Sequence, residues 1–179
     1  MSVLPRDPLL TTLRAIIWFF IGTLCLAAFG LVIAAPAVLF FQGEIAAELL
    51  ADGVTAPPMF IAALIGVLLA MGALVIMGIY FFWNLLAITD TVRDRDPFIA
   101  ENATRLTRMG WLTVAIYVGG LFVTIPGAWI ASIAADAGED VTFNAGLDGT
   151  GLVMILVLFV LARVFRMGAA MREDLEGTV

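Results

Sequence analysis

Histidine and lysine are absent from the 179 residues of the chain, and cysteine occurs once, as Cys25. The lack of histidine excludes a Ser-His-Asp set, and a single cysteine can form neither an internal disulfide nor a metal-binding cluster. No glycine-rich phosphate loop follows a strand. The sequence therefore argues against an enzyme, and we expect no catalytic residue, no metal site and no cofactor.

Charge is also scarce: 13% of the residues are charged, 63% are hydrophobic, and the mean hydropathy is +1.09. Soluble domains are roughly half apolar and a quarter charged, so the composition argues against a water-soluble fold. Four apolar runs are long enough to cross a bilayer, which takes about 20 residues. We expect an all-α membrane protein, a four-transmembrane-helix bundle forming a single domain over residues 1–179, with helices at about 14–41, 59–89, 109–135 and 151–171.

Two of the segments between these runs, residues 42–58 and 136–150, contain no basic residue. The positive-inside rule places arginine-rich segments in the cytoplasm. We therefore expect a multi-pass protein of the lipid bilayer with N-in/C-in topology and a cytoplasmic loop at 89–108. The nine arginines that set this orientation are Arg6, Arg14, Arg93, Arg95, Arg105, Arg108, Arg163, Arg166 and Arg172.

The first apolar run is uncharged from Ala15 to Phe41, over 27 residues. A secretory signal has an apolar core of only about 7–15 residues. We therefore expect the run to be retained as a membrane anchor.

The acidic residues give the chain a net charge of −6, and they are divided between both sides of the expected bundle. The arginine-bearing side is consequently mixed in sign, which argues against direct nucleic-acid binding. We interpret Asp136, Glu139 and Asp140 as a solvated acidic loop, with a loosely bound divalent cation as the alternative.

The segment before the third apolar run has a helical pattern of its own. Asp96-Pro97 is typical of an N-cap followed by the first helical residue, and apolar residues then recur every three or four positions, as at Phe98, Ala103 and Leu106. The pattern predicts a cytoplasmic interfacial helix over about 97–108. A cytoplasmic extension of the third span is the alternative.

Asn84 and Arg163 are the polar residues expected at membrane depth. With a rise of 1.5 Å per residue, Arg163 lies about 18 Å along its helix from Gly151. Spans two and four run in the same direction, so Arg163 could donate to the Asn84 carbonyl. The interpretation we favour is structural: Arg163 reaches the interface, and Asn84 bonds a neighbouring helix.

Small residues at Gly66 and Ala70 have the spacing that lets helices pack closely. Such a crossing could form within the bundle or between two copies, so a homo-oligomer stays open.

Two cytoplasmic stretches look like signatures: Asp94–Trp111 and Leu161–Val179. Together they resemble the YoaS-like family of small four-span bacterial membrane proteins, catalogued as a domain of unknown function. The resemblance covers nearly the whole chain. It implies a cytoplasmic (inner) membrane protein with no known enzymatic activity, and family members are often encoded beside a small helix-turn-helix regulator. The matching positions are Asp96, Pro97, Phe98, Asn102, Arg105, Phe165, Gly168, Arg172 and Asp174.

Both stretches lie on the expected cytoplasmic side and could pack together, with Arg105 or Arg108 pairing with Glu173 or Asp174, and Arg172 with Glu101. We hypothesise that they bind a cytoplasmic protein, such as the regulator. A stabilising cuff around the bundle is the alternative. Two other classes stay open: a small-solute transporter or channel subunit using Asn84 and Arg163, and a structural subunit of a membrane complex. The hypothetical partner-binding residues are Asp96, Phe98, Asn102, Arg105, Phe165, Arg172 and Asp174.

Overall fold

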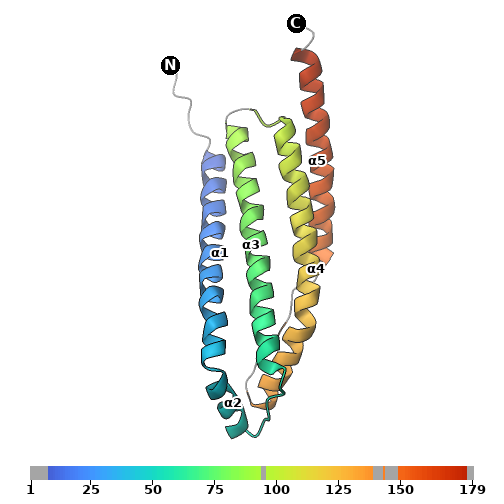
Figure 1. The fold of residues 1–179 in the computed structure, drawn as a ribbon. Helices are drawn as coiled ribbons and strands as arrows, with labels where there is room; N and C mark the ends of the chain where they lie inside the picture. Colours follow the sequence, from blue (N-terminus) through green and yellow to red (C-terminus); the bar gives the residue numbers. More distant parts are fainter. Residues whose placement is uncertain (1–7, 94–95, 139–142, 144–148, 177–179) are drawn as a thin grey trace. The chain divides into compact units, whose positions relative to one another are not determined.

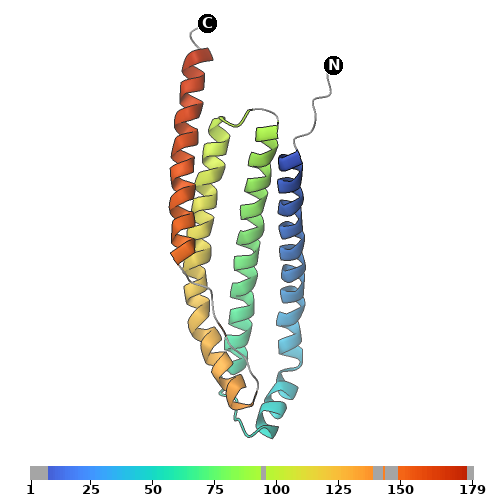
Figure 2. The same ribbon diagram turned by 180° about the vertical axis from the view of Figure 1, so that it is seen from behind.

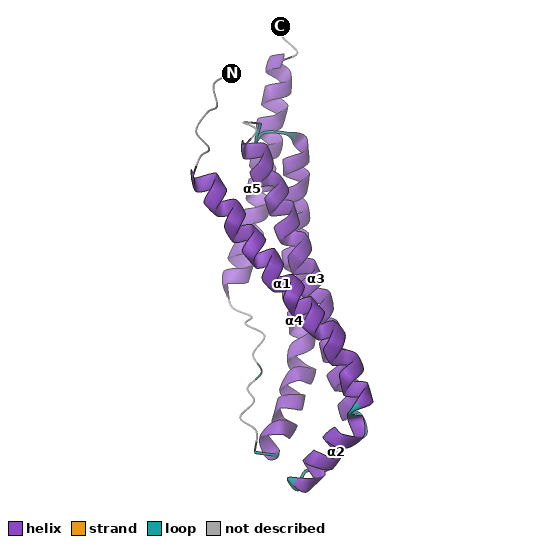
Figure 3. Ribbon diagram, turned by 90° about the vertical axis from the view of Figure 1, so that its left-hand side faces the viewer, coloured by secondary structure: helices purple, strands orange, loops and turns teal. Residues whose placement is uncertain are grey.

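A computed structural model describes residues 8–93, 96–138, 143 and 149–176. Of the residues singled out from the sequence, Arg6, Arg95, Glu139 and Asp140 lie outside these ranges. The described residues form five helices joined by loops, without strands (Figures 1 and 3). The helices are α1 (Pro8–Phe40), α2 (Gln42–Ala51), α3 (Phe60–Arg93), α4 (Ala100–Asp136) and α5 (Gly149–Glu176).

Helices α1, α3, α4 and α5 are long and apolar enough to cross a membrane. They confirm the expected all-α fold with four spans. Only 11–17% of the residues in the most apolar stretch of each span are buried within the chain. Water would strongly disfavour so much exposed apolar surface, whereas lipid does not, so the surface fits a multi-pass membrane protein.

The chain divides into two compact units. The first, which we call the arginine-bearing unit, combines residues 1–25, 77–115 and 149–179; the second unit combines residues 26–76 and 116–148. Helices α1, α3 and α4 contribute to both, while α5 belongs to the first alone. Every described arginine lies in the arginine-bearing unit, and the second unit contains no basic residue.

In the arginine-bearing unit, α5 packs beside α4, and α1 packs beside α3 (Figure 2). One end of this unit brings together four helix ends: the start of α1, the end of α3, the start of α4 and the end of α5. Two buried clusters hold it together. One is centred on Met109 and Leu158 between α4 and α5, and the other on Ile17 and Leu86 between α1 and α3.

The expected separate helix over 97–108 is not present, because α4 begins at Ala100 and continues without a break to Asp136. Two of the three apolar positions that predicted an interfacial helix are instead buried inside the unit: Ala103 is 1% exposed, and Leu106 packs with Leu158 and Ala162 of α5. The amphipathic pattern therefore reports contact with neighbouring helices, and the alternative of an extended third span describes α4 better. Asp96 also lies four residues before the helix and is not its N-cap.

The second unit contains a helix that the sequence interpretation missed. Residues 42–51 were assigned to a loop but form α2, which has no buried residue. It ends in a Schellman motif, in which the amides of Gly53 and Val54 donate to the carbonyls of Leu50 and Leu49. Gly53 has φ of +81°, a left-handed conformation that glycine adopts without steric cost.

Close packing in the second unit occurs at Gly119, where an added Cβ would lie 2.6 Å from Cδ2 of Leu74. At Gly66 an added Cβ would meet nothing within 4 Å. Gly66 therefore makes no tight crossing with the described part of this chain, and the prediction of a contact between two copies stays untested.

Candidate functional site

Asn102 organises the junction between α3 and α4. Its side chain is fully buried, with 0% exposure. Its amide nitrogen donates to Thr91 Oγ1 at 2.6 Å and to the Pro97 carbonyl at 2.9 Å. Its carbonyl oxygen accepts a hydrogen bond from Arg105 Nη1 at 2.9 Å. Since both amide hydrogens and the oxygen are used, Asn102 ties together the end of α3, the connection and the first turns of α4.

The connection is also fastened to α5. Asp96 forms an ion pair with Arg172, and the rings of Phe98 and Phe165 lie 5.3 Å apart between centroids. At Gly168 an added Cβ would lie only 2.7 Å from Cδ1 of Phe98, so the absence of a side chain there makes room for the ring. We call these five residues the α5 clamp. An exposed ion pair contributes only about 0–1 kcal/mol, so ring packing carries much of the contact.

The structure brings together most residues of the partner-binding hypothesis. Asn102 and Arg105 form the junction, while Asp96, Phe98, Phe165 and Arg172 form the α5 clamp with Gly168. We call the clamp together with Asn102 and Arg105 the platform. Asp174 follows Arg172 by two residues on α5.

The ion pairs of the platform differ from those expected. Arg172 pairs with Asp96, while Glu101, its expected partner, accepts from Arg105 Nη2 at 2.7 Å. Arg105 is thus held by its own helix and by Asn102. The pairing of Arg108 with Glu173 or Asp174 is not among the ion pairs of the described residues.

A further ion pair, which the sequence interpretation missed, joins α1 to α3 in the same unit. Arg14 Nη1 lies 2.6 Å from Asp90 Oδ1, with the two side chains 39% and 42% exposed. Trp18 and Trp83 also pack edge to face, with their ring centroids 6.3 Å apart. A signal was present in the sequence, because Arg14 stands at the start of the first apolar run and Asp90 follows the end of the second, so two antiparallel spans place both charges at the same side of the membrane.

Asn84 and Arg163 are not joined in the structure. The Asn84 amide donates to the Tyr80 carbonyl at 2.8 Å, one turn earlier in the same helix. Arg163 is exposed, and no hydrogen bond or ion pair links it to Asn84 in the described part of the chain. Asn84 therefore bonds its own helix, rather than Arg163 or a neighbouring helix as the two interpretations expected.

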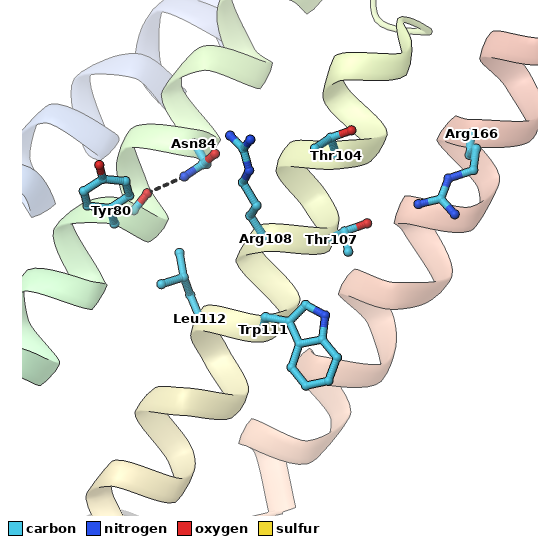
Figure 4. A pocket seen from close by; sticks show the side chains of 8 residues that line it. All are labelled: Tyr80, Asn84, Thr104, Thr107, Arg108, Trp111, Leu112 and Arg166. Carbon is cyan, nitrogen blue, oxygen red and sulfur yellow. Dashed lines mark hydrogen bonds between the residues drawn. The ribbon is translucent and has the colours of Figure 1, made fainter.

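A pocket of about 410 Å³ opens between α3, α4 and α5 within the arginine-bearing unit. Figure 4 shows Arg108 directed toward Asn84 and Arg166 directed from α5 toward α4. Neither arginine was in the set predicted from the sequence. A signal was available on α4, where polar and aromatic positions recur at helical spacing. The pocket is lined by Tyr80, Asn84, Thr104, Thr107, Arg108, Trp111, Leu112 and Arg166.

The described side chains contain no group of three or more acidic residues or cysteines placed to hold a metal ion. The four long apolar helices define a multi-pass α-helical membrane protein. The model of a family described as "Protein of unknown function (DUF2975)" matches residues 44–179, and the chain belongs to that family. No curated protein and no solved structure matches the chain. The family match confirms the expected membership of an unknown-function family, while the YoaS-like name stays a prediction.

Proposed function

We propose that this chain is a non-enzymatic protein of the bacterial cytoplasmic membrane that binds a cytoplasmic protein through the platform. The N-in/C-in orientation follows from charge: the described arginines all lie in the arginine-bearing unit, and residues 42–58 and 136–150 have none. The platform, at the ends of α3 and α5 and the start of α4, then faces the cytoplasm.

The observation that carries the proposal is the α5 clamp. It joins a short connection, residues 96–99, to the last turns of α5 through one exposed ion pair and one aromatic contact. Phe98 is still 44% exposed although it packs on Phe165. Aromatic residues, phenylalanine included, are enriched at protein interfaces, and we assign such a contact to Phe98 because it lies beside the Asp96–Arg172 ion pair.

The partner class comes from the family resemblance, whose members are often encoded beside a small helix-turn-helix regulator. A membrane protein that held such a regulator at the platform would keep it away from DNA without itself contacting nucleic acid. The role needs no catalytic group. The sequence, which contains no histidine and one cysteine, is compatible with such a role.

A two-hybrid assay in bacteria tests the proposal directly, with the protein as bait and a helix-turn-helix regulator encoded beside its gene as prey. Phe98→Ala should abolish the interaction, and deletion of residues 171–179 should weaken it strongly. Phe122→Ala is the matched control, because Phe122 is 76% exposed and lies in the second unit. An equal signal from all variants, at equal membrane levels, would reject the platform as the binding surface.

The transporter or channel class is less well supported. It depended on Asn84 and Arg163 acting together along one path, and Asn84 instead bonds its own helix. A structural subunit would use the same platform as a permanent contact; it is distinguished by co-purification of a stoichiometric membrane partner rather than a soluble one.

A further inference from the structure

Two groups of arginines can be distinguished within the arginine-bearing unit. Arg14, Arg105 and Arg172 each form an ion pair with an aspartate or glutamate. Arg108 and Arg166 line the pocket between α3, α4 and α5, and neither forms an ion pair or hydrogen bond with any residue that the structure describes. Two positive charges thus border one hollow, and none of the described residues that line it is acidic.

The lining of the pocket changes in polarity along α4. Thr104, Thr107 and Arg108 lie nearer the start of the helix, and Trp111 and Leu112 follow one turn further in. From Thr104 to Leu112 the helix rises by about 12 Å. A ligand that fits this gradient has a compact anionic end and an adjoining apolar part.

The side chains of the pocket favour phosphate as the anionic group. A guanidinium group offers a planar fork of donors that matches phosphate oxygens. The hydroxyls of Thr104 and Thr107 already donate to carbonyls of their own helix. The arginines are therefore the principal donors free to bind an anion.

The geometry points to a binding site for an anionic phospholipid, with the headgroup bound by Arg108 on the α3 side of the pocket and by Arg166 on the α5 side, and with the start of an acyl chain against Trp111 and Leu112. Basic pockets between membrane-spanning helices bind such headgroups, and tryptophan is enriched at the depth where headgroups meet hydrocarbon. The site goes beyond the proposed function: it requires insertion in a membrane but no cytoplasmic partner, and it uses none of the residues of the platform.

Native mass spectrometry of the detergent-purified full-length protein, titrated with phosphatidylglycerol or phosphatidylcholine, tests the site. Phosphatidylglycerol should bind at least about tenfold more tightly than phosphatidylcholine. Arg108→Gln and Arg166→Gln should each weaken its binding by about tenfold or more, the loss expected for one charge-assisted contact. Arg163→Gln is the matched control, because Arg163 lies on the same helix, is exposed and does not line the pocket; its effect should stay below about twofold.

Three results would overturn the inference. Equal affinity for the two lipids would show that charge is not recognised. An equal loss in all three variants would show a diffuse surface effect without a site. Displacement of phosphatidylglycerol by millimolar inorganic phosphate would assign the pocket to a soluble phosphate compound rather than a lipid. The lipid comparison and the phosphate competition use the unmodified protein, so they decide the question even if a variant fails to fold.

Discussion

Gly168 on α5 and Phe98 in the connection before α4 are in such close contact that a Cβ added at Gly168 would lie 2.7 Å from Cδ1 of the phenylalanine ring. Side-chain atoms do not approach so closely, and either the ring or the helix must move if the glycine is replaced. Phe98 is 44% exposed, so its ring has space to rotate outward. The relationship makes Gly168 the residue that permits the α5 clamp to close.

Gly168→Ala should therefore release Phe98 from Phe165 while costing little stability. An aromatic pair contributes about 0.5–1.5 kcal/mol, and alanine recovers about 0.5–1 kcal/mol of helix propensity over glycine. We expect a net change below about 1 kcal/mol in the free energy of unfolding, measured by denaturant titration in detergent, with loss of partner binding. Gly72→Ala is the control, because an added Cβ there meets nothing within 4 Å; a loss of binding in that variant would contradict the assignment.

Asn102→Ala should be among the more destabilising single changes in the arginine-bearing unit. The substitution removes hydrogen bonds to Thr91, Pro97 and Arg105 at a position with 0% exposure. A buried polar group left without its partner costs about 1–3 kcal/mol, and we expect a loss of roughly 2–3 kcal/mol in the free energy of unfolding. Thr104→Ala, at an exposed hydroxyl two residues away, should change it by less than about 0.5 kcal/mol. Similar values for the two variants would refute the role of Asn102 as the organiser of the junction.

Arg14 and Asp90 should show a small but measurable coupling. Both side chains are about two-fifths exposed, and such pairs contribute about 0.2–1 kcal/mol. A double-mutant cycle with Arg14→Gln and Asp90→Asn should give a coupling energy in that range, and it should fall as salt is added. A cycle with Arg172→Gln in place of Arg14→Gln should give no coupling, because Arg172 pairs with Asp96 rather than with Asp90.

The four spans could be predicted from the sequence because a membrane-spanning helix needs about 20 apolar residues in succession. Such a run is visible in the sequence without any knowledge of the tertiary contacts. The boundaries at Phe40 and Phe60 fall within one residue of the predictions. Helix α2 could not be predicted in this way, because its glutamates resemble a solvated loop and its end is set by a local turn at Gly53. The amphipathic pattern at residues 98–109 was detected, but it did not distinguish contact with lipid from contact with α3 and α5.

The membership of the platform could be predicted, but its pairings could not. The platform residues lie near one another because the two stretches that contain them, Asp94–Trp111 and Leu161–Val179, are expected on the same side of the membrane. The partner of Arg172 depends on the rotation of α5 relative to a connection that precedes it by 76 residues, and it proves to be Asp96 rather than Glu101. The pocket depends in the same way on which faces of three helices meet, so Arg108 and Arg166 carried no signal as a pair.

The orientation of the protein gives the last prediction. Cys25 is the sole cysteine, so a Cys25→Ala background lets a single introduced thiol report its side of the membrane. With Glu48→Cys on α2, a membrane-impermeant maleimide should label intact spheroplasts. With Glu173→Cys near the end of α5, the same reagent should label only after permeabilisation. The physical reason is the charge distribution, since arginine-bearing segments resist translocation and the segment around Glu48 has no arginine to retain it. The reverse pattern would place the platform outside the cell, where a cytoplasmic partner could not reach it, and the proposed function would fail while the phospholipid site could still stand.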